Sequence, residues 1–519
     1  MSNSRAALFI IVLAGIAVCL CGFWKYHGFS TDDSYISLRY CHNLIDGNGP
    51  VWNPGERVEG YSNFLFVILV GLFGRLGINL VLASKAISVA SFALLLGYLI
   101  WRGRRAFGNE IAGATISFQP ILLTGASYCM IIWSFGGLET TLFSLLVTGG
   151  VLTAWDGLTG EPRTAMTAGM VLGLATLTRP DGGLFFLIAA FFYLFPFIQR
   201  RPKSGLRLIA LFGPFVLLIG AHEIWRYAYY GQFLPNTWYV KGVVSWARLA
   251  MGWRYLIGFA ITQPFLLPVM IAALIYRTIA LSWNTELAFL SVSVFAFIAY
   301  VMAIGGDHML AYRPLIAVIP LLAVLIAKAL EPMLIGVRAV IAASLLAVLI
   351  ISQMAFPGRG IQGAEIPDGA AFCGEIVGKY INANWPAGSL VALNSAGATP
   401  YFAPNLRFLD MLGLNDTTIA RRNPTPMLLP YQIVPGHAKG DGRYVFDRKP
   451  DYIIAGPSNG SDIYHARTLS EYELAQIYDF KSLYRLKSVR LPVQQYDHYE
   501  QYAETKSGQM LFTYYERMR

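Results

Sequence analysis

Charged side chains are scarce in this 519-residue sequence: they make up 13% of it, whereas 55% of the residues are hydrophobic. A soluble chain of this size carries about 25% charged residues. The shortage is uneven, because long apolar runs fill residues 1–356 and charges become frequent over residues 357–519. The sequence therefore predicts a membrane domain over residues 1–356 and a soluble domain over residues 357–519.

Cysteine is also rare. Of five cysteines only Cys373 lies in the predicted soluble part, so no disulfide framework or zinc site is implied there. The formal charge of +10 does not indicate a nucleic-acid partner, because many basic residues lie in short loops between apolar runs, where they orient helices. The soluble part lacks a G-x-G-x-x-G motif, so no dinucleotide is implied.

A spanning helix needs about 20 mostly apolar residues, and roughly eleven runs meet that criterion. They begin near Ala7, Val81, Ile111, Leu138, Ala165, Gly183, Leu208, Arg254, Leu287, Tyr312 and Val337. The first run follows Arg5 without an A-x-A cleavage pattern, so it is interpreted as a retained span. A further run over residues 61–76 is interpreted as an interfacial helix, because a span there would place Arg102 and Arg105 outside.

This count places the N-terminus in the cytoplasm and residues 357–519 in the periplasm of an inner-membrane protein. The same orientation places the loops that carry ionisable residues on the outer face. A transporter would carry ionisable groups at mid-membrane in paired half-repeats. The asymmetry favours an enzyme at the outer leaflet. The alternatives are a transporter or flippase of a lipid-linked saccharide and a non-catalytic assembly subunit.

The first outer loop, residues 25–80, opens with the adjacent carboxylates Asp32 and Asp33. Tyr35, Leu38 and His42 follow at helical spacing, which predicts a short surface helix. A structural role is the alternative, with Thr31 or Asp32 as N-cap and Asp33 as a first-turn acid.

The rest of the loop is rich in turn formers, amides, carboxylates and aromatic rings, a composition suited to holding a sugar. An ordered turn is the alternative. The candidates for sugar or acceptor binding in this loop are Tyr35, Asn53, Glu56, Arg57, Glu59 and Tyr61.

The runs Asp32-Asp33-Ser34-Tyr35-Ile36 and Asn53-Pro54-Gly55-Glu56-Arg57-Val58-Glu59-Gly60-Tyr61 resemble bacterial GT-C membrane glycosyltransferases. The resemblance is strongest to the terminal arabinofuranosyltransferases of mycobacterial arabinan synthesis and to related pilin and envelope arabinosyltransferases. Further matches lie at residues 137–140, 178–182, 230–231, 234–237, 305–308, 313, 410–416 and 436–439.

The resemblance implies a polytopic GT-C-type protein that transfers a sugar and inverts its anomeric configuration. Arabinofuranose is the favoured sugar. The donor would be a polyprenyl phosphate and the acceptor an envelope glycan or surface glycoprotein. Because phosphate leaves without a general acid, one carboxylate base suffices. The resemblance favours Asp32 as that base, with Asp33 second. No cofactor is required, and a divalent cation is left open.

The donor phosphate calls for cations on the outer face. Arg313 and Arg179 lead, because a guanidinium gives phosphate two parallel hydrogen bonds; Lys241, His308 and Arg226 follow. The alternatives are interfacial snorkelling and, for Arg179, a pair with Asp181.

Asn236 and Trp238 are further sugar-binding candidates. Asp307 is a candidate for the same role. With His308 and Asp32 it is also compatible with a metal, but structural pairing is the favoured role.

Residues 357–519 predict a small α/β layer sheet, and the resemblance implies that this domain helps to bind or orient the acceptor. Helices are expected over residues 372–383 and 397–402, and strands over 389–393, 406–409 and 452–455. Asp410, Asp416, His437 and Lys439 are its notable polar positions, with capping or surface pairing favoured for each.

Overall fold

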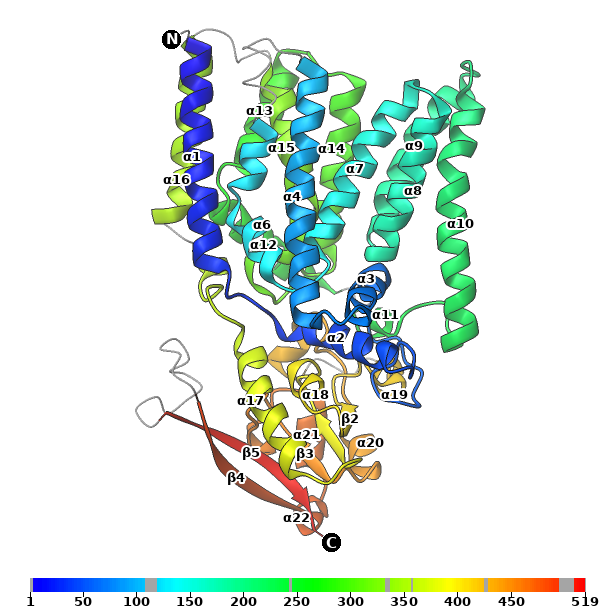
Figure 1. Cartoon of the computed structure of the whole chain (residues 1–519), viewed down its shortest axis with the longest axis vertical. Coiled ribbons are helices and arrows are strands. Elements are labelled where there is room, and N and C mark those ends of the chain that lie inside the picture. The colour runs from blue at the N-terminus through cyan, green and yellow to red at the C-terminus, as the bar shows by residue number, and fades with distance from the viewer. Residues whose placement is uncertain are drawn as a thin grey trace. The chain divides into compact units, whose positions relative to one another are not determined.

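The computed structural model describes residues 3–107, 119–241, 245–331, 337–355, 358–423, 428–493 and 508–518 (Figure 1). The chain forms two compact units, each built from segments distant in sequence. The helical unit comprises Met1–Phe29, Ser84–Trp225 and Leu249–Ile366. The α/β unit comprises Ser30–Ala83, Arg226–Arg248 and Pro367–Arg519.

Helices account for most of the helical unit, and three of them (α4, α10 and α12) also reach into segments of the α/β unit. They are α1 (Asn3–Tyr26), α4 (Leu80–Phe107), α6 (Tyr128–Phe135), α7 (Thr140–Thr159), α8 (Pro162–Thr178), α9 (Gly182–Ile198), α10 (Ser204–Tyr230), α12 (Trp246–Thr262), α13 (Leu267–Ile279), α14 (Thr285–Ala303), η1 (Leu310–Val318), α15 (Ile319–Leu330), α16 (Val337–Ala355) and η3 (Arg359–Ile361).

Among the described residues, five helices are long and apolar enough to cross a membrane, or six if one bent pair counts as a span. The five are Leu80–Arg105, Thr140–Thr159, Ser204–Tyr230, Thr285–Ala303 and Leu310–Leu330. Helices also lie at the runs predicted near Ala7, Ala165, Gly183 and Val337, whereas the run from Ile111 begins outside the described residues. A multi-pass helical membrane protein is supported, and the count of about eleven spans stays a prediction.

The span predicted near Arg254 is not one straight helix. It consists of α12 and α13, which meet at 91° across a short break. Pro264 lies in that break and Pro268 lies in the first turn of α13. Proline lacks a backbone N–H and clashes with the preceding turn of a helix, so the bend follows from the sequence.

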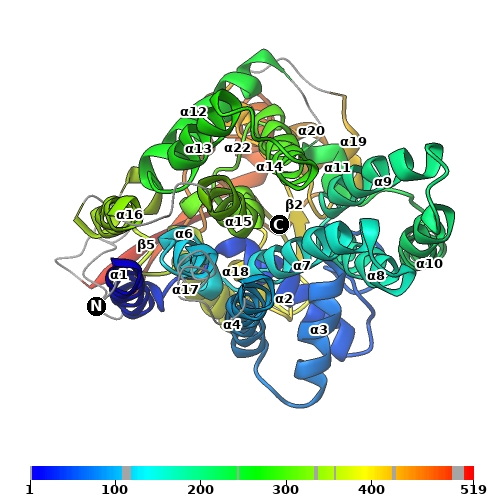
Figure 2. The ribbon, with the colours of Figure 1, turned by 90° about the horizontal axis from the view of Figure 1, so that it is seen from above.

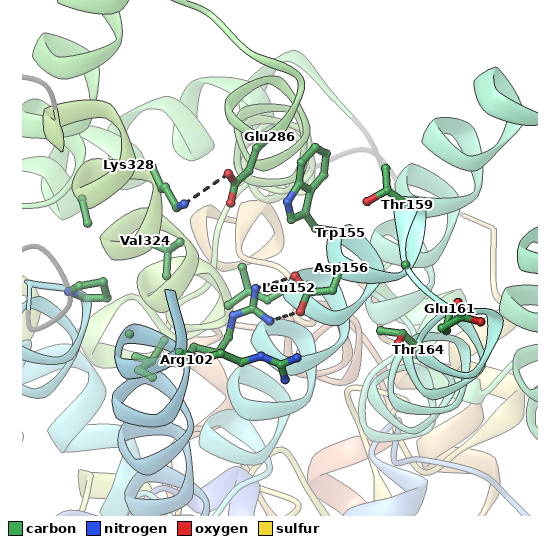
Figure 3. A pocket seen from close by; sticks show the side chains of 16 residues that line it. Arg102, Leu152, Trp155, Asp156, Thr159, Glu161, Thr164, Glu286, Val324 and Lys328 are labelled. Carbon is green, nitrogen blue, oxygen red and sulfur yellow. Dashed lines mark hydrogen bonds and ion pairs between the residues drawn. The ribbon is translucent and has the colours of Figure 1, made fainter. Parts of the chain in front are cut away.

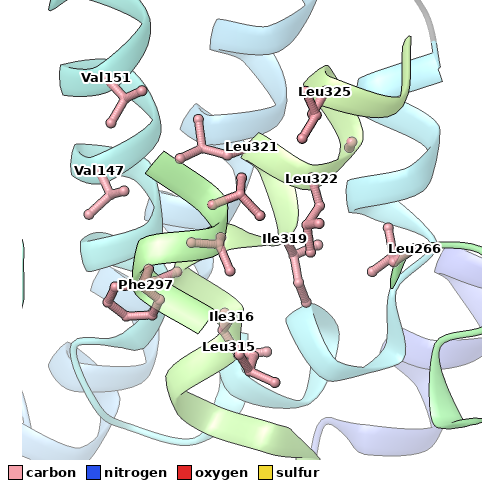
Figure 4. Close-up of a cluster of buried hydrophobic side chains, with 14 of the residues drawn as sticks. Val147, Val151, Leu266, Phe297, Leu315, Ile316, Ile319, Leu321, Leu322 and Leu325 are labelled. Atoms are coloured by element: carbon pink, nitrogen blue, oxygen red, sulfur yellow. The ribbon is translucent and has the colours of Figure 1, made fainter. Parts of the chain in front are cut away.

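The core of the helical unit lies around α15, which α6, α7 and α14 surround in the view from above (Figure 2). Ile319, Leu321, Leu322 and Leu325 of α15 are fully buried. They belong to one cluster with side chains from α7, α14 and the α12–α13 break, among them Val147, Val151, Phe297 and Leu266 (Figure 4).

Helices α8 and α10 approach each other at glycine. A Cβ on Gly169 would lie 2.0 Å from the Leu211 carbonyl oxygen, and one on Gly173 would lie 3.0 Å from the Leu218 side chain. Small residues four apart let helix backbones pack closely in a membrane, where the hydrophobic effect does not drive helices together. Gly169 and Gly173 therefore set the separation of these two helices.

We expect Gly169→Ala to lower the stability of the purified protein by about 1–3 kcal/mol, the usual cost of overpacking. Gly213→Ala on α10 is the matched control, because a Cβ there meets nothing within 4 Å. Alanine favours helix over glycine, so the control is expected to unfold at an equal or higher temperature. Thermal unfolding in detergent compares the two, and equal destabilisation would contradict the close approach.

The α/β unit is built on a five-stranded sheet with strand order β2-β1-β3-β5-β4. Its strands are β1 (Leu390–Leu393), β2 (Arg407–Asp410), β3 (Tyr452–Ile454), β4 (Tyr484–Pro492) and β5 (Gln509–Arg517). The first three run parallel, and β5 and β4 continue the sheet antiparallel. The structure has a sheet with strands at the three predicted positions, whereas their parallel pairing and the antiparallel pair were not predicted.

Helices α17 (Gly369–Asn384) and α18 (Ala398–Tyr401) match the two helices predicted in this region. The remaining elements are short: α19 (Thr417–Arg421), η4 (Pro430–Ile433), α20 (Gly442–Asp447), η5 (Ile463–His465), α21 (Leu469–Ala475) and α22 (Phe480–Leu483). Ala392 of β1, Leu409 of β2 and Ile453 of β3 are buried together with Val445 and Leu474 from the helices.

The α/β unit also contains the first loop, with α2 (Asp32–Ile45) and α3 (Phe64–Arg75), and the segment that carries α11 (Asn236–Lys241). Helix α3 has 12 residues, about 18 Å at 1.5 Å per residue, which is too short to cross a bilayer core of about 30 Å. The domain boundary near residue 357 stays a prediction, but compactness groups the first loop with the C-terminal segment.

Candidate active site

Helix α2 begins with the two predicted catalytic carboxylates, and its first turn is bound to α17. The Asp32 backbone N–H donates to Asp368 Oδ2 at 3.0 Å. The other Asp368 oxygen accepts from Ala371 N–H at 2.7 Å and so caps α17. The Asp368 N–H donates to the Ser30 carbonyl oxygen at 2.9 Å. One aspartate therefore joins the beginnings of two helices.

The Asp32 side chain is bound to the beginning of α18. Its Oδ1 accepts from Ala398 N–H at 2.7 Å, and its Oδ2 accepts from Gly397 N–H at 3.2 Å. A Cβ on Gly397 would lie 1.9 Å from the Asp32 carbonyl oxygen, so only glycine fits there. We call Asp32, Asp368, Gly397 and Ala398 the carboxylate–amide junction.

Asp32 is buried, with 9% of its surface exposed, whereas Asp33 is half-buried. Burial, and then the charge of Asp368, raise the pKa of Asp32 to about 7, against the lowering effect of the two amides. Burial raises the pKa of Asp368 as well. A carboxyl whose pKa lies near neutrality is suited to general-base catalysis.

This shift makes stability depend on pH. A carboxyl with a folded-state pKa above its unfolded value binds protons more readily when folded, so stability falls as pH rises from about 4 to about 7. We expect the unfolding temperature to be a few degrees higher at pH 5 than at pH 8. Asp32→Asn should reduce that difference in scanning fluorimetry, and an unchanged difference would contradict the assignment.

Helix α2 is also held by Arg39, which is buried. Its guanidinium donates to the carbonyl oxygens of Trp52 at 2.7 Å and Leu406 at 3.2 Å, and to that of Pro400. It lies 4.9 Å from the ring of Phe408. Burial lowers the pKa of Arg39 to about 9.

Replacing Arg39 by methionine keeps an apolar stem and removes three hydrogen bonds. The carbonyl oxygens of Trp52 and Pro400 keep bonds from Asn43 Nδ2 and Ala403 N–H. A hydrogen bond from a charged donor contributes about 1.5–3 kcal/mol, so we expect a loss of about 3 kcal/mol or more. Arg443→Met on the exposed face of α20 is the control, and a surface change of that kind costs about 0.5 kcal/mol or less. Chemical unfolding in detergent should separate the two, and similar losses would contradict the role of Arg39.

The predicted sugar-binding residues of the first loop mostly hold that loop on the sheet. Asn53 Nδ2 donates to the Phe408 carbonyl oxygen at 2.7 Å, and Phe408 N–H donates back to Asn53 Oδ1 at 3.1 Å. Glu56 pairs with Arg407 at 2.7 Å. The Tyr35 ring lies 5.4 Å from that of Tyr401.

The other predicted residues of this unit make similar contacts. Glu59 and Arg226, both buried, form a bidentate pair at 2.8 and 3.3 Å, which engages the Arg226 guanidinium. Tyr61 shares a 3.2 Å hydrogen bond with Tyr230. Asn236 Nδ2 donates to the carbonyl oxygen of Leu414 at 2.9 Å.

Three predicted residues of this unit are exposed. The Arg57 guanidinium lies 4.7 Å from the ring centre of Tyr229. Trp238 has 59% of its surface exposed. Lys241 ends α11, and its carbonyl oxygen accepts from Arg248 at 2.8 Å.

The polar residues noted from the sequence of the C-terminal segment have mainly structural contacts. The Asp410 carboxylate accepts from the backbone N–H groups of Leu412, Gly413 and Asn415. Asp416 caps α19, and Lys439 donates to the Arg422 carbonyl oxygen at 2.6 Å. The His437 ring lies 5.6 Å from that of Tyr431. Capping, the expectation favoured for the aspartates, describes Asp416, whereas Asp410 holds the turn that follows β2.

In the helical unit, Arg179 is part of an ion-pair network. It contacts Asp181 Oδ2 at 2.7 Å and Glu139 Oε1 at 3.1 Å. Tyr300 donates to the other Asp181 oxygen at 2.9 Å. The structural alternative for Arg179, a pair with Asp181, is therefore present.

Arg313 pairs with Asp307 Oδ2 at 2.8 Å, and His308 Nδ1 lies 3.2 Å from the other Asp307 oxygen. The backbone just before Arg313 is strained, because Ala311 and Tyr312 adopt positive φ values of 55° and 51°. Such conformations gather at functional sites. Among the described residues, no three His, Cys, Asp or Glu side chains group as metal ligands.

A cavity of about 630 Å³ lies where α4, α7 and α15 end and α8 and α14 begin (Figure 3). Arg179 and Arg313 lie at the opposite ends of α8 and α15. Ion pairs Arg102–Asp156 and Lys328–Glu286 line the cavity. No predicted site residue is among the lining residues.

Sequence reasoning missed Asp368, Gly397, Ala398 and Arg39. An Asp before a predicted helix is a recognisable N-cap, which was the available signal for Asp368. Its partner in α2 lies 336 residues away, and no spacing rule connects them.

Residues 364–504 match a family model described as a domain of unknown function (DUF8728). The chain is 28% identical over 288 residues to the terminal β-(1→2)-arabinofuranosyltransferase of Mycobacterium tuberculosis. It is 26% identical over 395 residues to the terminal β-(1→2)-arabinofuranosyltransferase of Corynebacterium glutamicum. This chain is similar to terminal arabinofuranosyltransferases.

The two alignments cover 52% and 64% of this chain, and 44% and 52% of the relatives. The chain therefore spans about half the length of the curated relatives it matches. The resemblance found in its motifs is confirmed by these matches.

The fold is similar to that of ArnT from Cupriavidus metallidurans bound to undecaprenyl phosphate, with a TM-score of 0.50. The two are 12% identical, and the likeness covers 76% of this chain and 85% of ArnT. This comparison supports the expected fold of a polytopic helical membrane protein.

Proposed function

We propose that this chain is an inverting glycosyltransferase of the inner membrane. It transfers a sugar from a polyprenyl-phosphate donor to an envelope glycan or surface glycoprotein on the outer face of that membrane. Arabinofuranose is the favoured sugar. The observation that carries the proposal is Asp32, a buried carboxylate held by two amides in a chain similar to arabinofuranosyltransferases. The ArnT structure with undecaprenyl phosphate supports the lipid-linked donor.

In this proposal Asp32 is the base. A carboxylate has about four lone-pair positions, and the two amides occupy two of them. The acceptor hydroxyl gives its proton to a remaining position while its oxygen attacks the anomeric carbon. The bond to the donor phosphate breaks, and the phosphate leaves with the electron pair. The sugar is inverted, because a single displacement occurs from the opposite face. Asp33, half-buried on the same turn, would hold a hydroxyl group of the acceptor or the sugar.

Arg313 remains the leading candidate for the donor phosphate. Its pairing with Asp307 means that a phosphate would join or displace that carboxylate. Arg179 ranks second, because two carboxylates contact it. The bidentate pair with Glu59 makes Arg226 a structural residue in this scheme.

The first test incubates purified protein with labelled polyprenyl-phosphate arabinofuranose and envelope glycan acceptors, and identifies the product. Hexose donors run in parallel. Transfer from a hexose donor alone would contradict the arabinofuranose assignment, and lipid translocation without a new glycosidic bond would contradict the enzyme. Nothing in the comparisons favours a transporter.

The second test compares Asp32→Asn with Asp33→Asn. Loss of a general base costs about 100- to 10,000-fold in rate, and we expect that loss in kcat for Asp32→Asn. Asp33→Asn should mainly raise KM, because it removes binding. Asp46→Asn, at the exposed end of the same helix, is the control and should keep the normal rate. Normal transfer by Asp32→Asn would overturn its role as base.

A further inference from the structure

Within the α/β unit, the beginnings of α2, α17 and α18 meet at two carboxylates. Asp368 accepts the first N–H of α2 and also caps α17. Asp32 in turn accepts the N–H groups of Gly397 and Ala398 at the beginning of α18. The positive ends of helix dipoles favour negative charge at such positions. The backbone and the side chain of Asp32 are thus bound by different parts of the C-terminal segment.

The contacts leave Asp32 little freedom. Two residues before Asp32, the Ser30 carbonyl oxygen accepts a hydrogen bond from Asp368 N–H. The Gly397 backbone is so close that a Cβ there would lie 2.7 Å from Asp32 Cγ. Further along α2, Arg39 ties the helix to the Leu406 carbonyl oxygen. The direction of the Asp32 carboxylate therefore depends on the C-terminal segment.

We propose that the C-terminal segment, matched as a domain of unknown function, completes the active site by positioning the base. Asp368 and the amides of Gly397 and Ala398 are the positioning groups. The inference rests on the proposed function, in which Asp32 takes the acceptor proton. It gives residues 364–504 a task in catalysis in addition to any contact with the acceptor.

The carboxylate–amide junction also changes the pKa of Asp32, through the charge of Asp368. The titratable groups that face Asp32 within this unit are Asp33 and Tyr35 on α2 and Asp368 from α17, while α18 contributes backbone amides. The Asp368 charge raises the pKa of Asp32. Removing that charge while keeping an oxygen acceptor should lower the pKa. The limb of kcat/KM that rises with pH reports the base of the free enzyme, so the limb should move to lower pH.

The experiment uses the full-length enzyme and the labelled lipid-linked donor. Asp368→Asn removes the charge and keeps one of the two oxygen acceptors, so it retains either the bond from Asp32 N–H or the bond from Ala371 N–H. Gly397→Ala pushes against the Asp32 backbone. Asp441→Asn is the matched control, because Asp441 caps α20 in the same unit through Tyr444 N–H at 2.9 Å.

We expect Asp368→Asn to shift the rising limb to lower pH and to keep most of the plateau rate. Gly397→Ala should lower kcat by about 100-fold with KM unchanged, the cost of a displacement near 1 Å. Asp441→Asn should change neither quantity. A rising limb of Asp368→Asn that coincides with the wild-type limb would overturn the positioning role, as would a normal kcat in Gly397→Ala.

Hydrogen exchange of the amides of residues 32–36 separates this inference from the proposed function, because it needs no substrate. Faster exchange there in Gly397→Ala and not in Asp441→Asn supports the junction. Unchanged exchange overturns it. Failure of the wild-type enzyme to transfer any sugar would refute the proposed function, and the exchange result would still decide whether the C-terminal segment holds this turn.

Discussion

The paired hydrogen bonds from Gly397 and Ala398 to the Asp32 carboxylate are the contact on which the α/β unit depends. A buried carboxylate costs free energy unless hydrogen bonds compensate for its lost water, and here backbone amides do so. The same constraint shapes the rest of the first loop. Arg39, Asn53 and Glu59 are buried, and each finds a partner in the backbone or in another charged side chain. The loop is therefore ordered by satisfied polar groups together with buried apolar side chains such as Trp52 and Phe66.

In the helical unit, ionisable side chains are compensated by ion pairs instead of backbone hydrogen bonds. Its ionisable side chains at one end of the helices are paired, Arg179 with Asp181 and Glu139, and Arg313 with Asp307. Between helices, close packing at Gly169 replaces the polar contacts. In the proposed function, a donor phosphate would join or displace a carboxylate in these existing ion pairs.

Much of the fold followed from local pattern. Apolar runs located the helices, and period and length located α17, β1, β2 and β3. The antiparallel pair β4 and β5 was missed although Tyr484–Pro492 alternates polar and apolar residues, which is a strand signal; most side chains of this edge strand are exposed. The break between α12 and α13 was signalled by Pro264, but its 91° angle was not.

For the site, the sequence by itself determined which residue types gather in the first loop and that Asp32 and Asp33 open a helix. Local spacing suffices for both, because helix periodicity and capping act within a few residues. Only the tertiary structure decided that Asn53, Glu56 and Glu59 hold the loop in place, since the same side chains would suit a sugar equally well. Their partners, like Asp368 and Gly397 for Asp32, lie between 167 and 365 residues away. Hydrogen-bond partners at that separation are chosen by the packing of the whole unit, which no local pattern encodes.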